Sequence, residues 1–183
     1  MLSVRRLEMN MTQEKNISSL LVRTAVAEDH DAINGLYMSV KGRGFCIWND
    51  EYPEEEDIDV DIAKGNLLVL TNDAEIVGAL SIIDETEWDE LGVWSVADHV
   101  ALIARVCIAP AWQGHGLSAM LLQESERILI SRGCKAIRLL VARTHLPAIK
   151  TYLNAGYEIM GRCSMYGHEY YACEKVLTGC SDA

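Results

Sequence analysis

The sequence lacks several features that would indicate a specialised class of protein. None of its apolar runs is long enough to span a bilayer, so we expect no membrane partner. The N-terminus carries Arg5 and Arg6 without a following apolar stretch, so we expect no signal peptide. The six cysteines include no C-x-x-C pair and no cluster with histidine, which argues against a metal site. Free thiols in a reducing, cytoplasmic compartment are the better interpretation.

Basic residues are also scarce. The chain has 16 Lys and Arg against 27 Asp and Glu, which gives a net charge of −11. Binding to nucleic acid without sequence preference needs a basic surface, so we expect no nucleic-acid partner. The acidic balance is compatible with a cationic or amine substrate, although many acidic proteins are merely soluble.

The sequence contains no internal repeat and no low-complexity linker. Half of its 183 residues are hydrophobic, which suits a globular chain long enough to bury a core. Residues 1–18 are polar and are predicted to form a loose tail. We expect residues 19–178 to form a single mixed α/β domain. The sequence leaves both a monomer and a homodimer open.

Hydrophobic spacing predicts alternating strands and helices over most of the domain. Apolar runs bounded by turn residues predict strands at 19–26, 67–71, 75–83, 100–108, 136–141, 157–160 and 169–177. Helical spacing between cap and stop signals predicts helices at about 30–40, 117–130 and 147–153. The strand at 100–108 is apolar except for Arg105 and is therefore predicted to be central.

Two segments have a different texture. Residues 45–66 combine aromatic side chains, including Trp48 and Tyr52, with an acidic run at 54–57. They are predicted to form a surface loop and the start of an acidic helix, and the aromatic residues either anchor the loop or line a substrate cleft. Residues 84–98 form a polar, acidic loop that also contains two tryptophans.

The most informative stretch is the turn between the strand at 100–108 and the next helix. Gly114 and Gly116 lack a Cβ, so the backbone there can approach a ligand closely. The helix beginning near Leu117 presents unpaired N–H groups and the positive end of its dipole. Such a turn favours phosphate binding. A mononucleotide site is a weaker interpretation, because neither Gly-Lys-Ser/Thr nor a Rossmann fingerprint is present.

Two motifs in this context resemble the GCN5-related N-acetyltransferase (GNAT) superfamily. The first is Gln113-Gly114-His115-Gly116-Leu117-Ser118, where the family has Gln/Arg-x-x-Gly-x-Gly/Ala and Ser118 departs from the final small residue. The second is His145-x-x-Ala148-x-x-x-Tyr152-x-x-x-Gly156-Tyr157, where His145 replaces the family's asparagine. The resemblance spans residues 20–177. It implies a mixed, mostly antiparallel central sheet flanked by helices, with a splayed central strand that holds acetyl-CoA.

The resemblance also implies a cosubstrate and its binding residues. Acetyl-CoA would place its pyrophosphate on the amides of the turn and its pantetheine arm along the central strand, like a missing strand partner. The implied cofactor-binding residues are Val106, Cys107, Ile108, Gln113, Gly114, His115, Gly116, Leu117, Ser118, Ala119 and His145. His145 could instead cap the short helix that follows it.

An acetyltransferase of this kind transfers the acyl group directly to an amine. The amine, with a pKa near about 10, must first lose its proton, and the leaving thiolate benefits from a proton donor. Tyr152 stands where family members place that donor, and its alternative role is a core aromatic. Positions where members carry a base hold the aliphatic residues Leu102, Ala104 and Leu140. The base is therefore expected from the loop at 84–99, with Glu85 and His99 preferred over Glu87 and Asp98, or from ordered water.

Three further residues have competing interpretations. Arg105 is either a buried ion partner or a structural strand residue, and His115 is expected beside the phosphates rather than in catalysis. Cys107 lies on the proposed cofactor strand, but no histidine partner is spaced to activate it, so packing is the better interpretation.

We therefore expect an acetyl-CoA-dependent N-acetyltransferase acting on a small or peptidic amine. The acidic residues at 54–57 and 85–90 favour a cationic acceptor. The alternative is a catalytically silent acyl-CoA-binding module, which the missing strand bases, Ser118 and His145 would favour.

Overall fold

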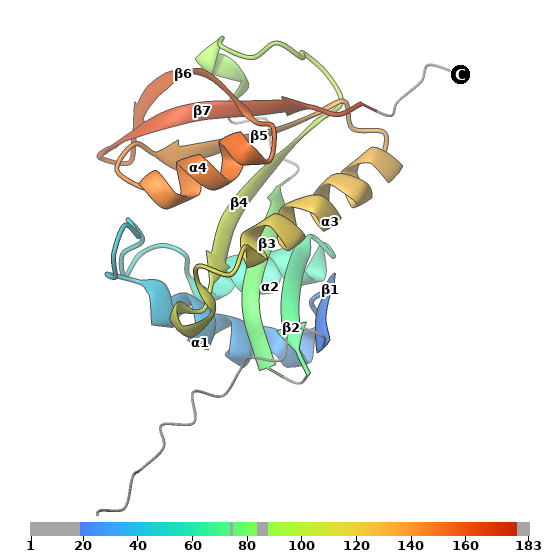
Figure 1. Ribbon diagram of the computed structural model, residues 1–183, viewed down its shortest axis with the longest axis vertical. Helices are drawn as coiled ribbons and strands as arrows, with labels where there is room; N and C mark the ends of the chain where they lie inside the picture. The colour runs from blue at the N-terminus through green and yellow to red at the C-terminus, as the bar shows by residue number, and fades with distance from the viewer. Residues whose placement is uncertain (1–18, 74, 84–87, 179–183) are drawn as a thin grey trace, which may run out of the picture.

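A computed structural model describes residues 19–73, 75–83 and 88–178 of the chain. Within these residues, seven strands form one sheet in the order β1-β2-β3-β4-β5-β7-β6 (Figure 1). Every neighbouring pair is antiparallel except β4 and β5, which are parallel. The predicted mixed, mostly antiparallel sheet is thereby confirmed.

The elements follow one another along the chain as β1 (Leu20–Thr24), α1 (His30–Val40), α2 (Glu55–Ala63), β2 (Leu67–Asn72), β3 (Glu75–Ile83), β4 (Val100–Ile108), α3 (Leu117–Ser131), β5 (Ala136–Ala142), α4 (Leu146–Asn154), β6 (Glu158–Met165) and β7 (His168–Val176). The bounds of β3 and β4 coincide with the predicted ones. The acidic run at 54–57 does begin a helix, α2.

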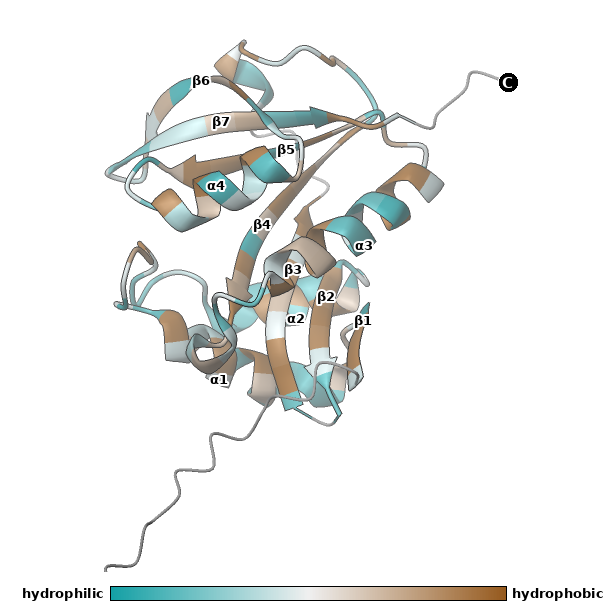
Figure 2. Ribbon diagram, viewed as in Figure 1, coloured by the Kyte–Doolittle hydropathy of each residue, from teal (hydrophilic) through white to brown (hydrophobic). Residues whose placement is uncertain are grey.

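Helices cover both faces of the sheet and divide the core in two. One hydrophobic cluster lies between the strands and α3 and α4, and includes Leu121, Leu139 and Tyr152. The other lies beneath α1 and α2, and includes Ile33 and Ile58. β2 is buried on both faces, which explains why it is a continuous apolar run rather than an alternating one. Figure 2 shows this run and the apolar residues of β3 in brown, and much of the outward side of α3 in teal.

One predicted strand was too short. Residues 157–160 were expected to form a strand, whereas β6 runs from Glu158 to Met165. β6 is an edge strand whose side chains are mostly half-buried or exposed, so it carries little of the hydrophobic signal that marks strands. The predicted tail at 1–18 lies outside the described residues.

The sheet opens in its middle. β4 pairs with β5 only through Val100, Ala101 and Leu102. Beyond Leu102 the two strands separate, and β5 continues along β7 while β4 continues along β3. Figure 1 shows β4 running away from β5 towards the lower half of the molecule. The second half of β4 therefore has a ladder partner on one side only, as expected for a splayed central strand.

Candidate active site

The opening between β4 and β5 leads to the glycine turn. Gly114 and Gly116 adopt left-handed conformations with φ of 81° and 74°, which are accessible to glycine at little cost. The four residues from Gln113 to Gly116 are exposed. The Gln113 side chain donates a hydrogen bond from Nε2 to the carbonyl oxygen of Ile108, with 3.0 Å between the atoms. This bond ties the turn to the end of β4.

The helix that follows the turn, α3, has no side-chain cap at its N-terminus. Gly116 is the N-cap of α3, and no side chain caps the helix. Its first residue, Leu117, is buried in the core and fixes the helix, while Ser118 and Ala119 are half-buried. The first-turn amides and the positive end of the helix dipole can therefore receive an anion. The ring of His115 lies back on the turn, with Nδ1 2.9 Å from the carbonyl oxygen of Gln113.

The candidate cofactor-binding residues of β4 differ in their burial. Val106 is half-buried, whereas Cys107 and Ile108 are buried on opposite sides of the sheet. Burial raises the pKa of the Cys107 thiol well above its usual value. A thiol in this state is a poor nucleophile, which favours packing over an acyl-cysteine role for Cys107.

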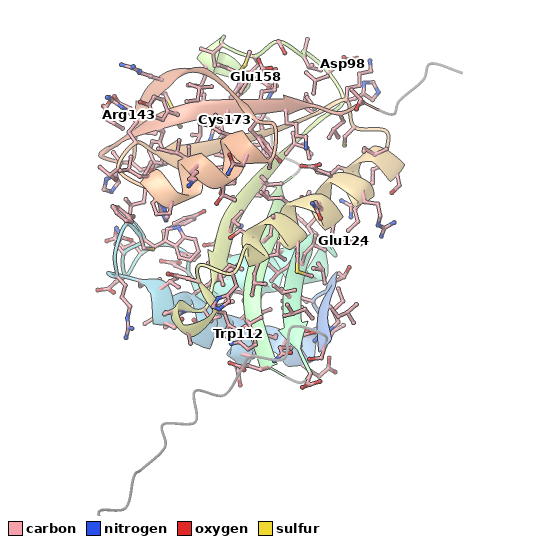
Figure 3. The ribbon with its side chains drawn as sticks, in the orientation of Figure 1. Asp98, Trp112, Glu124, Arg143, Glu158 and Cys173 are labelled. Carbon is pink, nitrogen blue, oxygen red and sulfur yellow. The ribbon has the colours of Figure 1, made fainter. Side chains whose placement is uncertain are left out.

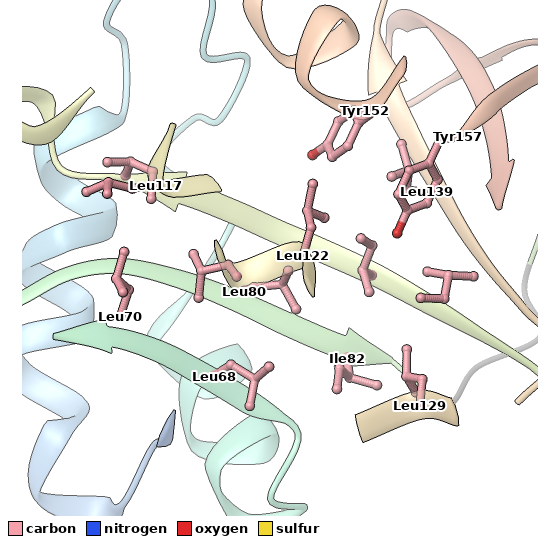
Figure 4. Packing of buried hydrophobic residues seen from close by; sticks show 14 of the residues in the cluster. Leu68, Leu70, Leu80, Ile82, Leu117, Leu122, Leu129, Leu139, Tyr152 and Tyr157 are labelled. Carbon is pink, nitrogen blue, oxygen red and sulfur yellow. The ribbon is translucent and has the colours of Figure 1, made fainter. Parts of the chain in front are cut away.

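Tyr152 lies on α4 above the separated strands. It is 9% exposed, and its ring packs edge-on against Tyr157 with 5.8 Å between the ring centroids. Figure 4 shows its hydroxyl pointing away from Tyr157 and towards the Leu117 side of the opening. Burial raises the pKa of Tyr152, so its phenol keeps its proton at neutral pH.

His145 lies at the start of the same helix. Its Nδ1 accepts a hydrogen bond from the backbone N–H of Ala148, so the side chain caps α4. Its ring also stacks against Phe45, with 5.7 Å between the ring centroids. The loop after α1 therefore contacts the N-terminus of α4 across the opening.

Arg105 is a buried ion partner. Its guanidinium donates to Asp57 and Asp61 of α2, at N–O distances of 2.6 and 2.7 Å, and only 9% of its side chain is exposed. Burial raises the pKa of Asp61, and the charge of Arg105 acts in the opposite direction. The guanidinium also lies 5.5 Å from the centroid of the Tyr52 ring.

Arg105, Asp57 and Asp61 line a pocket of about 430 Å³ on the α2 side of the sheet. Its charged lining comprises five acidic and two basic side chains: Glu51, Glu54, Glu56, Asp57, Asp61, Lys64 and Arg105. The end of β3 supplies the apolar residues Ile82 and Ile83. Because carboxylates outnumber cations, the pocket favours a positively charged occupant.

Tyr52 and Trp48 also have defined partners. The Trp48 ring packs edge-on against Tyr37 of α1, with 5.3 Å between the centroids, and Tyr52 packs against Trp48 at 6.3 Å. Trp48 therefore anchors the loop after α1 to the core. Tyr52 lies between this anchor and Arg105, at the edge of the acidic pocket.

Of the two preferred bases, the structure describes His99 only, and it does not bring His99 to this group of residues. His99 precedes β4, at the end opposite the glycine turn, and pairs with Asp98 at 3.0 Å. Its side chain is 63% exposed. Figure 3 shows Asp98 near the top of the molecule and Trp112 in its lower half. The two residues flank β4 in the chain, so they lie beyond its opposite ends. Glu85 and Glu87 lie outside the described residues.

Sequence reasoning missed the carboxylates that hold Arg105. A lone arginine in an apolar strand indicated a buried ion pair, but Asp57 and Asp61 lie 48 and 44 positions away in the chain. Asp57 ends the acidic run at 54–57, which matched an exposed helix start equally well, and Asp61 lies one helical turn further on. Their spacing of four residues, which places both on one face of α2, was the available signal.

The described residues contain neither a candidate membrane helix nor a candidate metal cluster. In the ranges 19–73, 75–83 and 88–178, no helix is long and apolar enough to cross a membrane. Over the same part of the chain, no group of three or more His, Cys, Asp or Glu side chains could hold a metal ion.

Comparison with known proteins gives a consistent result. The model of the acetyltransferase (GNAT) family matches residues 33–157. YesJ, an uncharacterised N-acetyltransferase of Bacillus subtilis strain 168, is 28% identical over 163 residues, which cover 84% of this chain and 88% of YesJ.

Solved structures share the fold. A GNAT-family acetyltransferase from Streptococcus agalactiae 2603 superposes with a TM-score of 0.74 at 20% identity, covering 87% of this chain and 96% of the other. The yncA protein from Salmonella typhimurium, solved with its cofactor acetyl-CoA, superposes with a TM-score of 0.70 at 18% identity, covering 90% and 97%. At these identities the likeness establishes the fold.

Proposed function

Because the chain belongs to the GNAT family of acetyltransferases, we propose that it transfers an acetyl group from acetyl-CoA to a primary amine, with Tyr152 as general acid. The observation that carries this proposal is the separation of β4 from β5 beside the uncapped N-terminus of α3. We also propose a single acetyltransferase domain at 19–178, which contains all seven strands of the sheet described above. A cytoplasmic location is proposed as well, because it suits the free thiols of the described cysteines.

The cosubstrate fits the opening in one direction. Its pyrophosphate would lie on the amides from Gly114 to Ala119, where the left-handed glycines and the helix dipole favour an anion. Its pantetheine amides would pair with the backbone of Val106 to Ile108, which β5 no longer reaches. The thioester then lies further back along β4, beneath α4.

Tyr152 would complete the transfer. When the amine attacks the thioester carbon, the C–S bond breaks and the departing sulfur takes the phenolic proton. The raised pKa of Tyr152 keeps this proton in place at neutral pH. Cys107 would take no part, because its buried thiol stays protonated.

The acceptor would enter from the acidic pocket on the α2 side. The excess of carboxylates in its lining supports a cationic amine, either a small molecule or a peptide. Glu85 or an ordered water would remove the amine proton, since His99 lies at the far end of β4. Whether the enzyme works as a homodimer does not affect this reaction, because every group named belongs to one chain.

Thermal unfolding with ligands tests the cosubstrate. A ligand that binds only the folded chain stabilises it by about 2.7 kcal/mol at a hundredfold excess over its Kd. Acetyl-CoA and CoA should raise the unfolding midpoint, whereas ATP and NAD should not. Mass spectrometry of amines incubated with enzyme and acetyl-CoA then tests the transfer. Stabilisation without any acetylated amine would identify a silent acyl-CoA-binding module instead.

A further inference from the structure

We propose that Arg105 is a positioning residue, whose ion pairs to α2 hold β4 in a bulge that faces the acyl group of acetyl-CoA. The inference rests on the proposed use of acetyl-CoA at this site. Its elements are the alternation of side chains along β4, the backbone conformation of Arg105 and the two carboxylates that hold its side chain.

Side-chain alternation shows that β4 contains an extra residue. Ile103 and Ile108 both pack in the core on the α3 side, whereas Cys107 packs in the core on the α1 side. In a regular strand, residues five positions apart point to opposite faces. Ile103 and Ile108 can therefore share a face only if one extra residue between them interrupts the alternation of side chains.

The ladder with β3 locates the insertion. The register shifts by one residue between Ala79 and Ser81, so that Arg105 and Val106 both lie opposite Leu80. Two residues facing one define a β-bulge, which leaves backbone groups unpaired and bends the strand. The bulge sends the Arg105 side chain to the α2 face, which a regular strand would not do.

Arg105 adopts a conformation that needs support. Its φ is +52°, in the left-handed region, which for residues with a Cβ is disfavoured by roughly tenfold or more. The support comes from α2, where Asp57 and Asp61 receive one guanidinium nitrogen each. Only 9% of the side chain is exposed, and an unpaired buried guanidinium would destabilise the fold. The ion pairs therefore favour the side-chain rotamer and the backbone conformation that bring Arg105 to the two carboxylates.

The bulge lies where the acyl group is expected. It follows Leu102, the last residue of β4 that pairs with β5. A pantetheine arm that runs back along β4 from Ile108 through Val106 brings its thioester to this point. Backbone N–H groups left unpaired by the bulge can donate to the thioester carbonyl as negative charge develops on its oxygen. Arg105 would act through the backbone that it holds, without touching the substrate.

Isotope-edited infrared spectroscopy of bound acetyl-CoA, labelled with 13C at the carbonyl, reads this contact directly. A hydrogen bond from the bulge should lower the carbonyl frequency of the bound cosubstrate relative to the free one. Two double variants separate backbone shape from charge: Arg105→Gly with Asp61→Asn, and Arg105→Ala with Asp61→Asn. Both remove the buried ion pair, but only glycine adopts the left-handed conformation freely.

The proposal expects the glycine variant to keep the lowered carbonyl frequency and the alanine variant to lose it, with kcat about a hundredfold lower and the Kd for CoA unchanged. Retention of the lowered frequency in the alanine variant would overturn it, because the bulge would then form without the ion pairs of Arg105 and without a glycine. Asp59→Asn, an exposed change on the same helix, is the control for α2.

Two further outcomes are decisive. If the alanine variant does not fold, Arg105→Lys carries the test, because a single ammonium cannot replace the fork that pairs with both carboxylates. The proposal then expects a smaller carbonyl shift, and an unchanged shift would overturn it. A wild-type enzyme that binds acetyl-CoA without lowering the carbonyl frequency would also overturn it. A normal shift without acetylation of any amine would instead refute the proposed function and leave the role of Arg105 intact.

Discussion

The imidazole of His145 accepts a hydrogen bond from the backbone N–H of Ala148, with 3.2 Å between Nδ1 and the amide nitrogen. This bond caps α4, the helix that carries Tyr152. An imidazole can accept through Nδ1 only when that nitrogen carries no proton. Burial lowers the pKa of His145, which keeps the cap in its accepting form. The position of the proposed general acid therefore depends on a neutral histidine.

The cap should make stability depend on pH. Because the folded-state pKa of His145 lies below the unfolded value of about 6.5, its contribution is complete above that pH and is lost as the pH falls through the folded-state pKa. His145→Asn should keep a cap but remove the titration. Thermal midpoints of the two proteins, measured from about pH 7.5 to 5, should diverge as the pH falls, with wild type losing more. A constant difference would contradict the cap.

Tyr152→Phe should slow the chemistry without weakening cosubstrate binding. Loss of a positioned general acid lowers kcat by about 10² to 10⁴. Steady-state kinetics gives kcat, and calorimetry gives the Kd for acetyl-CoA, which should stay unchanged. Tyr157→Phe is the matched control, because its buried hydroxyl makes no hydrogen bond to the described residues. Equal turnover in wild type and Tyr152→Phe would rule out the acid role.

Gly116→Ala should weaken binding of acetyl-CoA. The substitution places a Cβ on a left-handed residue at the N-cap of α3, so the turn must shift away from the phosphate-binding geometry. Gly133→Ala is the control, because Gly133 is also left-handed, with φ of 80°, and open on its side, but lies beyond the other end of α3. Calorimetry should show a loss of affinity in the first variant alone. Similar affinities in both would separate the turn from the cosubstrate.

Gly78→Ala should destabilise the fold. A Cβ on this residue of β3 would lie 2.6 Å from Cδ1 of Ile108 and 3.2 Å from the carbonyl oxygen of Cys107. Overpacking of this kind costs about 1–3 kcal/mol. Gly35→Ala in α1 has open space around it and should stabilise by about 0.5–1 kcal/mol. Urea unfolding measures both, and opposite signs are expected. A neutral Gly78→Ala would show that β3 and β4 pack less tightly than described.

Removing one partner of the buried Arg138–Glu174 ion pair should destabilise the fold strongly. Their side chains are 2% and 1% exposed, and the N–O distance is 3.2 Å. Glu174→Gln leaves the arginine without its buried counter-charge and should lower the free energy of unfolding by about 3–5 kcal/mol. Glu124→Gln, which affects an exposed ion pair on α3, should change it by less than about 1 kcal/mol. Comparable losses in urea unfolding would argue against a special role for burial.

The sequence predicted the order of elements because strong local signals marked most of them. β4 is a nine-residue strand that is apolar except for Arg105 and is followed by a glycine turn, and its bounds were predicted correctly. β6 was predicted too short because an edge strand need not be apolar. The bulge at Arg105 could not be predicted, since it reflects which face each side chain of β4 occupies after folding.

The candidate site was predictable only where it is continuous in the chain. The glycine turn and the Tyr152 helix are local motifs, and the structure brings both to the opening between β4 and β5. The contacts of Arg105 with Asp57 and Asp61 join segments more than 40 residues apart, and the acidic run gave no indication of its partner. His99 was proposed from its place beside a strand, without knowledge of which end of that strand faces the cleft.

The kinetic mechanism, sequential or ping-pong, tests the central claim of direct attack most directly. Initial rates of amine acetylation, measured at several fixed concentrations of acetyl-CoA and varied amine, distinguish direct attack from an acyl-enzyme. Direct attack requires both substrates on the enzyme together and predicts double-reciprocal lines that intersect. Parallel lines would indicate a covalent acyl-enzyme, such as one on Cys107. They would contradict the account, as would the absence of any acetylated amine.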